Sequence, residues 1–217
     1  MAGEQEFRGG GVTTITAVVP WLNHRELERD FWAAMRVADV EVLVIDNGSD
    51  PPLPNAYRLP ENVGFSRACN IGLELARTDA VLYLNNDVIA TERDWIEPIR
   101  AALEPGVLVG ASLRRHPHGD VDGIPMPYLD GWCLAGMTDD LRDLGGFCED
   151  LEEPAYFSDN LLCLEARAAG MVLREARVGL RHLENRTAGH GDGVTAATLA
   201  NQRIFRHRAR QLLTVAA

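Results

Sequence analysis

The chain has 217 residues, 46% of them apolar, and a formal net charge of −11 in which every one of the 21 basic residues is arginine. This length suits one α/β domain with a substantial core and is short for two. The negative charge argues against broad nonspecific adhesion to nucleic acid, and no segment approaches the ~20 consecutive apolar residues of a membrane span. The start of the chain lacks the basic and apolar regions of a secretory signal. The cysteines have apolar neighbours and no CxxC spacing, which indicates reduced core thiols in a cytoplasmic protein: Cys69, Cys133, Cys148 and Cys163.

Residues 1–11 are Gly-rich and polar, and we expect them to form a disordered tail. Beyond them, apolar runs rich in β-branched residues alternate with segments whose apolar residues recur at helical spacing. The runs predict strands at Val12–Val19, Glu41–Ile45, Tyr57–Leu59, Ala80–Leu84 and Val107–Leu113. The other segments predict helices at about His24–Val37, Ser66–Arg77 and Glu92–Leu103. This alternation predicts an α/β fold with a single doubly wound, mainly parallel sheet flanked by helices.

Several residues set the expected limits of these elements. Pro20 should close the first strand, Ser66 should be the N-cap of the second helix, and Pro98 should kink the third. The stripes Leu27, Phe31, Met35 and Cys69, Leu73, Ala76 should face the core.

Residues 114–130 have no clean period, which is typical of a lid or acceptor-facing segment or of disorder. The tail, Thr195–Leu213, predicts a helix that carries four arginines and a histidine. Two interpretations of it are open. Its basic residues form a solvated face while Ile204, Phe205, Leu212 and Leu213 dock on the domain, or they form a surface for peripheral contact with anionic lipid or a polyanionic acceptor. No repeat or linker divides the chain.

Polar residues gather where three predicted elements end or begin. The run Ala80–Leu84 ends abruptly in Asn85, Asn86 and Asp87, and the strand before it runs into Asp46 and a turn-forming Asn-Gly pair. A glycine turn precedes the helix near Ser66. Open α/β sheets bind their ligands at the carboxyl ends of their strands, so these clusters predict a ligand crevice.

The order of these motifs resembles that of family 2 glycosyltransferases with the GT-A fold, most closely the bacterial rhamnosyl- and galactofuranosyl-type members. The first half carries Val18-Val19-Pro20-x-x-Asn23, Ile45-Asp46-Asn47-Gly48-Ser49-Asp50, Asn62-x-Gly64-Phe65 through Asn70-x-Gly72, and Leu84-Asn85-Asn86-Asp87. The second half carries Gly145-Gly146-Phe147, Tyr156-Phe157-Ser158-Asp159, Leu162-Cys163-Leu164 up to Gly170, and His182 followed by Thr187. The likeness spans roughly residues 14–190.

The resemblance implies an inverting hexosyltransferase that moves a sugar from a UDP- or dTDP-linked donor to a hydroxyl acceptor with the help of Mn²⁺ or Mg²⁺. It also implies one glycosyltransferase domain at 12–217. Residues 12–113 would bind the nucleotide sugar, 114–190 the acceptor, and 191–217 would be a C-terminal helix.

The resemblance assigns roles to individual residues. Asp87 would be the metal ligand and His182 would complete the metal shell, although a lone histidine after an apolar run is also a common structural residue. Asp159 would be the general base, and it also reads as the N-terminal acid of an amphipathic helix. Asp46 would accept hydrogen bonds from the base or ribose of the nucleotide, or else cap the turn at Gly48.

The remaining donor-site assignments are Pro20, Asn23, Asn62, Gly64, Phe65, Asn70, Asn85, Asn86 and Trp132. Asn70 would line the nucleotide pocket or satisfy helix backbone. Trp132 would stack on a sugar or base ring or belong to the core.

The sequence departs from the family pattern at four positions. Asn85 replaces the first carboxylate of the Asp-x-Asp motif, and Ser158, Leu161 and Glu165 replace a Glu, an Asp and an Arg on the acceptor side. A degenerate, non-catalytic nucleotide-binding partner module and a phage enzyme that glycosylates modified DNA bases are therefore alternatives. A nucleotidyltransferase is disfavoured, because the chain has no Gly-rich phosphate loop with a lysine. The acceptor could be a glycan, a lipid-linked glycan, a metabolite, a protein side chain or a modified nucleic acid.

Overall fold

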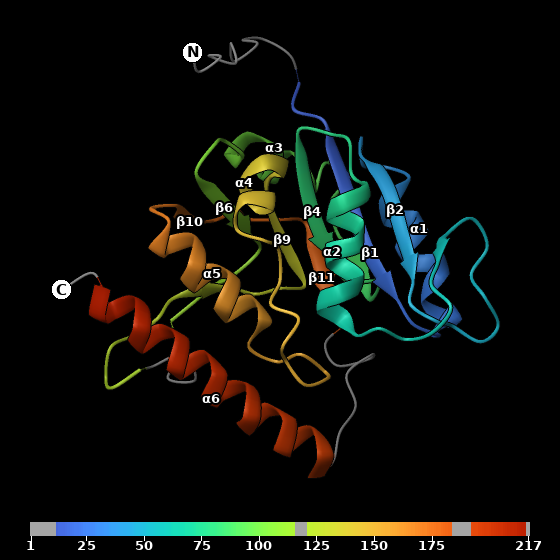
Figure 1. The fold of residues 1–217 in the computed structure, drawn as a ribbon. Coiled ribbons are helices and arrows are strands. Elements are labelled where there is room, and N and C mark those ends of the chain that lie inside the picture. Colours follow the sequence, from blue (N-terminus) through green and yellow to red (C-terminus); the bar gives the residue numbers. More distant parts are fainter. Residues whose placement is uncertain (1–11, 116–120, 184–191, 216–217) are drawn as a thin grey trace, which may run out of the picture.

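The computed structural model describes residues 12–115, 121–183 and 192–215, without the side chains of 192–194 and 213–215. Its centre is a seven-stranded sheet in the order β10-β6-β9-β4-β1-β2-β3 (Figure 1). The strands are β1 (Ile15–Trp21), β2 (Glu41–Asp46), β3 (Tyr57–Arg58), β4 (Ala80–Leu84), β6 (Val107–Gly110), β9 (Cys133–Met137) and β10 (Val172–Glu175). Neighbouring strands are parallel except that β9 runs antiparallel to both β4 and β6. Two small antiparallel sheets pair β5 (Val88–Ala90) with β11 (Leu180–His182), and β7 (Leu113–Arg114) with β8 (Tyr128–Leu129).

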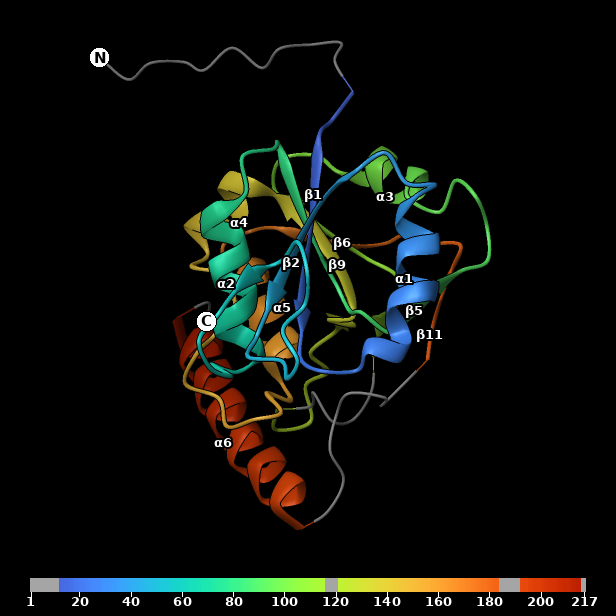
Figure 2. The ribbon, with the colours of Figure 1, turned by 90° about the vertical axis from the view of Figure 1, so that its right-hand side faces the viewer.

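Helices cover both faces of the large sheet (Figure 2). On one face, α1 (Glu28–Met35) and α3 (Glu97–Ala102) pack with the strands into an apolar core that contains Phe31, Met35 and Ile99. On the other face, α2 (Phe65–Leu75), α4 (Thr138–Asp143) and α5 (Ser158–Ala168) form a second core. The predicted class, an α/β fold with a mostly parallel sheet flanked by helices, is confirmed.

The last helix, α6 (Asp192–Val215), lies against α5 and is visible at the lower edge of Figure 1. It is slightly longer than the predicted Thr195–Leu213. Phe205 is fully buried in a third apolar cluster, with Ile204 and Leu212 partly buried beside it, whereas the side chain of Leu213 lies outside the described part. None of the helices in the described ranges is long and apolar enough to span a membrane.

The strand predictions were right in place but wrong at some ends. Ala80–Leu84 is correct to the residue, because a run buried on both faces has no ambiguous flank. The first strand continues through Pro20 to Trp21. On the side of β1 that faces β4, only Ile15–Val18 are paired. No strand lies beside Pro20 there, so its missing N–H leaves no carbonyl of a neighbouring strand without a donor. The predicted strand Val107–Leu113 is instead two strands, β6 and β7, in different sheets, because the chain leaves the large sheet at Gly110, where it passes over Leu129.

The helix limits needed more correction. The first helix begins as a 3-10 turn (Arg25–Leu27) before α1, and α3 starts at Glu97 rather than Glu92. Pro98 does not kink α3 but lies in its first turn, where the missing N–H has no intrahelical partner to lose. Within residues 114–130, the described part forms β7, β8 and a bridge between Val121 and Ile124.

Ser66 is not an N-cap. The helix α2 begins one residue earlier, after Gly64, and the buried Ser66 hydroxyl has no hydrogen-bond partner among the described residues. The N–H of Phe65 instead donates to Glu153 Oε1 at 2.9 Å. The group that satisfies this helix end is thus 88 residues away in the sequence. The stripe Cys69, Leu73 and Ala76 is buried as expected.

All four cysteines are free thiols, three of them buried and Cys148 partly buried. The predicted tail 1–11 and Thr187 lie outside the described residues. The division of the chain at 113 and 190 stays a prediction.

Candidate active site

A pocket of about 420 Å³ opens where β1, β2 and β4 reach their carboxyl ends. Residues 22–24, Asn62 and Phe65 also line it, and the remaining wall comes from far along the chain: the 130–132 segment before β9, the 153–159 segment that leads into α5, and His182 in β11. The acidic and imidazole side chains among its described lining are four carboxylates and two histidines, and no arginine or lysine is among them: Asp87, Asp130, Glu153, Asp159, His24 and His182. The pocket lies where the sequence predicted a ligand crevice.

Asp87 and His182 lie side by side in this pocket. Pairing of β5 with β11 places His182 opposite Val88, and His182 Nε2 is 3.0 Å from Asp87 Oδ1. Asp87 is 1% exposed, yet neither of its carboxylate oxygens has a hydrogen-bond partner among the described residues. The side-chain amide of Asn85 is 3.2 Å from the same imidazole nitrogen. A buried carboxylate without hydrogen bonds lowers the stability of the fold unless a cation or a hydrogen-bond donor compensates its charge.

These two side chains fit a divalent cation, because carboxylate oxygen and neutral imidazole nitrogen are ligands that Mn²⁺ accepts. Within the described ranges, no three His, Cys, Asp or Glu side chains lie close enough together to hold a metal. Among the residues that the structure describes, Asp87 and His182 are the two side chains that would hold the cation. Asn85 stands beside this pair but brings an amide instead of a second carboxylate.

Trp132 holds His182 from one side. The two rings are parallel within 4°, with centroids 5.0 Å apart. The carbonyl oxygen of Trp132 also accepts a hydrogen bond from the backbone N–H of Asn85 at 2.9 Å. Trp132 lines the pocket and is partly buried against the core of the α1 face, and its stacking on a sugar or base ring stays a prediction. Its indole nevertheless contacts an imidazole of the protein.

Asp159 lies in the first turn of α5 and faces the pocket. Its Oδ2 accepts a hydrogen bond from the Gly131 N–H at 3.0 Å and its Oδ1 one from the Asn160 N–H at 2.8 Å. Burial raises the pKa of Asp159 to about 6, and the nearby charge of Asp130 adds to the rise, while the two backbone hydrogen bonds oppose it. A carboxylate with such a pKa is ionised at neutral pH and more basic than an ordinary aspartate.

An amide network forms the wall at the end of β2. Asn47 Nδ2 donates to Asn62 Oδ1 at 2.9 Å and to the carbonyl of Gly64 at 3.2 Å, and Asn47 Oδ1 accepts from the Val63 N–H. Both asparagines line the pocket, as do Asn86 and Phe65. Gly64 itself is absent from the lining, but its φ of +89° allows the turn into α2, and a Cβ there would meet Glu153 Oε1 at 2.4 Å.

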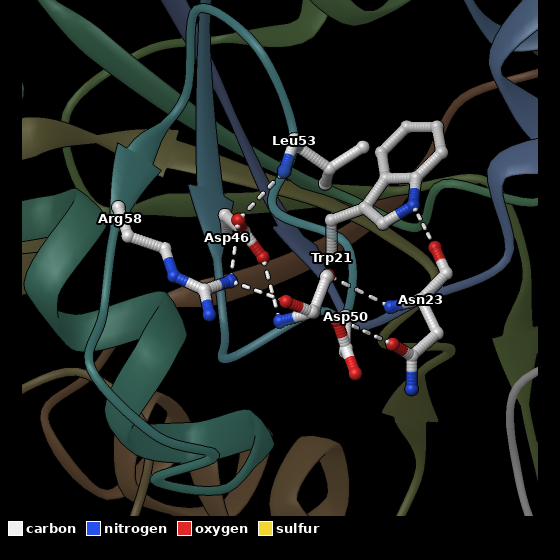
Figure 3. A network of polar contacts seen from close by, with 7 residues as sticks. Trp21, Asn23, Asp46, Asp50, Leu53 and Arg58 are labelled. Atoms are coloured by element: carbon white, nitrogen blue, oxygen red, sulfur yellow. Dashed lines mark hydrogen bonds and ion pairs between the residues drawn. The ribbon is translucent and has the colours of Figure 1, made fainter.

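Asp46 is outside the described lining of the pocket, and its contacts fit the second of its two expected roles, that of an aspartate capping the turn after β2. It is fully buried and accepts hydrogen bonds from the Ser49 and Leu53 N–H groups, both at 2.9 Å, and from Arg58 Nη1 at 2.7 Å (Figure 3). Burial raises the pKa of Asp46, but the hydrogen bonds from Ser49, Leu53 and Arg58 outweigh it and lower the pKa below the ordinary value. Since successive residues point to opposite sides at a strand end, the next residue, Asn47, faces the pocket instead.

Asn23 and Pro20 line the pocket, and their contact with a donor stays a prediction. The same loop is tied to the turn after β2, because the Asn23 N–H donates to Ser49 Oγ and Asn23 Oδ1 accepts from the Asp50 N–H (Figure 3).

Asn70 is not in the described lining and does not satisfy its own helix. It bonds both the N–H and the carbonyl of Phe147, each at 2.8 Å, and also Glu149. It therefore joins α2 to the segment after α4.

Sequence reasoning missed several lining residues: Asn47, Asp130, Glu153 and Tyr156. Asn47 was visible as a polar neighbour of Asp46. Asp130 and Glu153 had no local signal, because they lie in segments without periodicity, and only the folded chain brings them to the sheet edge.

Three comparisons place the chain among known proteins. The chain resembles the solved structure of the mannosyltransferase PcManGT from Pyrobaculum calidifontis in complex with GDP-Man and Mn²⁺, with a TM-score of 0.63 and 16% identity over 94% of this chain and 75% of that one. At that identity the likeness concerns the fold alone, and it matches a GT-A glycosyltransferase fold. No curated protein matches the sequence. The family model "Glycosyl transferase family 2" matches residues 16–132, more than half of the chain and the whole stretch from β1 to Trp132. The chain belongs to glycosyl transferase family 2.

Proposed function

We propose that the protein is a metal-assisted, inverting glycosyltransferase that moves a hexosyl group from a nucleotide-diphosphate donor to a hydroxyl acceptor. The observation that carries this proposal is that one pocket contains both a buried carboxylate without hydrogen bonds beside an imidazole, Asp87 with His182, and a carboxylate of raised pKa, Asp159. Family 2 membership supports glycosyl transfer.

The residues divide the reaction between them. Asp159 accepts the proton of the acceptor hydroxyl while the hydroxyl oxygen forms a bond to the anomeric carbon of the sugar. The bond from that carbon to the diphosphate oxygen breaks at the same time, and the nucleoside diphosphate leaves with the electron pair. Direct displacement of this kind inverts the anomeric centre. When bound at Asp87 and His182, a divalent cation such as Mn²⁺ or Mg²⁺ would neutralise charge on the departing diphosphate.

The charge of the pocket supports a requirement for a cation. A nucleoside diphosphate is an anion, and the described lining offers it four carboxylates and no arginine or lysine. Without a metal, the pocket would therefore repel the donor. The same charge disfavours a polyanionic acceptor such as DNA and favours a neutral or amine-bearing one.

The donor nucleotide is proposed to be UDP or dTDP, with its base or ribose near the amides of Asn47 and Asn62 and the loop of Asn23. The bound GDP-Man of the Pyrobaculum calidifontis mannosyltransferase adds GDP to the nucleotides that should be tested. A rhamnosyltransferase-like specificity stays a proposal of the same kind.

A calorimetric binding experiment tests the function. Purified protein is titrated with UDP, dTDP and GDP in the presence of Mn²⁺, Mg²⁺ or EDTA, together with the variants Asp87→Asn and Asp159→Asn. An exposed carboxylate on α4 that is outside the described lining gives the matched control Asp143→Asn. We expect metal-dependent binding of at least one nucleotide, lost in Asp87→Asn and kept in Asp159→Asn and in the control.

Transfer or donor hydrolysis is then measured with the nucleotide sugar of the class that binds. Asp159→Asn should abolish turnover although its nucleotide affinity is intact. If the wild-type protein binds nucleotide and metal but turns over no donor, the chain is the degenerate binding module. If no nucleotide binds, the proposal is wrong.

A further inference from the structure

The C-terminal helix α6 is tied to the wall of the pocket by one buried side chain. Asn201 is fully buried, and its Oδ1 accepts a hydrogen bond from the Glu152 N–H while its Nδ2 donates to the Glu152 carbonyl, both at 2.8 Å. The two bonds satisfy both backbone groups of one residue. Glu152 belongs to the segment 151–157, called the wall segment below, which connects α4 and its following turn to α5.

An apolar contact reinforces this connection one helical turn later. Phe205 of α6 is fully buried and packs on Phe157 with ring centroids 5.6 Å apart. Leu151, Ala155 and Phe157 of the wall segment share one buried cluster with Phe205 and Ala209. The helix α6 therefore contacts the wall segment near its first residues, at Glu152, and at its last residue, Phe157.

The wall segment needs such support because its backbone is strained. Ala155 and Phe157 have φ values of +56° and +75°. Residues other than glycine rarely adopt this left-handed conformation, because it brings their Cβ too close to the following carbonyl oxygen. Strained residues persist only where their surroundings hold them, so the buried contacts with α6 are what we expect to keep this conformation.

The wall segment also shapes the site. Glu153, Ala155 and Tyr156 line the pocket, and Glu153 accepts the hydrogen bond from the first residue of α2. Two residues after the wall segment comes Asp159. A displacement at Glu152 would thus be carried directly to the carboxylate that faces the acceptor.

We propose that Asn201 is a positioning residue: through Glu152, it fixes the wall segment and the start of α5 in the geometry that transfer requires. This inference rests on the proposed function for its catalytic consequence. It makes α6, which lies beyond the residues matched by the family model, part of the active-site scaffold.

The test compares Asn201→Ala with Leu199→Ala, a substitution of an exposed side chain on the same helix. Three quantities are measured: hydrogen exchange of the wall segment by mass spectrometry, affinity for UDP with Mn²⁺, and hydrolysis of a UDP-hexose with water as the acceptor. If another nucleotide is the one that binds, that nucleotide and its sugar replace them.

For Asn201→Ala we expect faster exchange in the wall segment, a nucleotide affinity within about twofold of wild type, and a kcat for hydrolysis that is lower by about 10- to 100-fold, since misplacement by about 1 Å can cost that much. Leu199→Ala should match wild type in all three. General destabilisation alone would not produce a loss of kcat with unchanged nucleotide affinity in folded protein. Unchanged exchange in the wall segment, or unchanged kcat despite faster exchange, would overturn the proposal.

Exchange in the wild-type protein provides a second measurement if Asn201→Ala does not fold. The backbone N–H groups of Glu152 and its neighbours should exchange at least about tenfold more slowly than in an unstructured chain. Exchange at the rate of an unstructured chain would refute the proposal that Asn201 fixes the wall segment. Because exchange needs no ligand, it also separates the two proposals. If the wild-type protein binds no nucleotide, the proposed function is wrong. The exchange measurement still decides whether Asn201 fixes the wall segment.

Discussion

Asp159 should make the folded protein less stable at neutral pH, and its removal should therefore stabilise the fold. Its pKa is about 6, against an ordinary value of 3.8, so the folded state holds the proton more tightly than the unfolded state does. A carboxyl with a raised folded-state pKa lowers the free energy of unfolding progressively as pH rises from about 4 to about 6, and the loss is complete above that range. At about 1.4 kcal/mol per unit, the full cost of ionisation is about 3 kcal/mol.

The variant Asp159→Asn removes this cost but keeps only one of the two acceptor oxygens for the backbone N–H groups of Gly131 and Asn160. A lost hydrogen bond costs about 1 kcal/mol, which leaves a net gain of about 2 kcal/mol. For a chain of this size the melting temperature should rise by about 4 to 8 °C.

The assay is denaturant unfolding of wild type and variant at pH 8 and pH 4, on either side of the titration. The gain should be present at pH 8 and absent at pH 4. At pH 4 the carboxyl is protonated in the folded state and only partly ionised in the unfolded state, so the remaining cost of ionisation is smaller than the cost of the lost hydrogen bond. Asp143→Asn, at an exposed position, should show no such pH-dependent gain. The reasoning is refuted if Asp159→Asn is less stable than wild type at pH 8, or if its gain is the same at both pH values.

Three further outcomes are expected. The kcat/KM of donor turnover should be level above about pH 6 and fall about tenfold per pH unit below it, because Asp159 must be ionised to accept a proton. A profile that breaks near pH 4 would argue against the raised pKa of Asp159. Trp132→Leu should weaken Mn²⁺ binding in the presence of nucleotide by about tenfold, measured by calorimetry, whereas Trp132→Phe keeps a ring on the imidazole and should lose less; equal losses would contradict the stacking argument. Gly64→Ala should be more destabilising than Gly106→Ala in thermal unfolding, because both glycines have a positive φ but only at Gly64 does the new Cβ meet a neighbour, Glu153; equal losses would mean that Glu153 moves away freely.

The sequence predicted the elements of the fold well wherever burial alone decides them. The run Ala80–Leu84 is apolar throughout because β4 lies in the middle of the sheet with helices on both faces. The stripe Leu27, Phe31 and Met35 has the period of a helix that packs one face on the sheet.

The prediction failed where the deciding partner lies far away in the chain. The start of α2 depends on Glu153, which no local pattern around Ser66 reveals. The strand after Val107 breaks because Leu129 occupies the space above Gly110. Both contacts exist only once the chain has folded.

The candidate site shows the same division at finer scale. The clusters at the ends of β2 and β4 were identified correctly as parts of one crevice. At the end of β2, however, the choice between Asp46 and Asn47 depends on which way each side chain points, and this follows from the turn that Arg58 and Leu53 close over Asp46. Polarity marks the position of a site in the sequence, but strand register decides which of two adjacent residues enters it.

The reversed direction of β9 has a consequence for how this site could diversify. Because β9 is antiparallel to β4, the residue that enters β9, Trp132, meets the residue that leaves β4, Asn85, and the ladder from Leu84–Cys133 to Ala80–Met137 fixes that meeting point. The chain between β7 and β9 finishes at the pocket, where Asp130 and Trp132 line it, and pairing of β7 with β8 and of β9 with β4 anchors it near both ends. Exchange of side chains at this end of the span would therefore leave the register of the large sheet unchanged. The sheet thus separates a backbone register that must be kept from side chains at its edge that can change and so reshape the pocket.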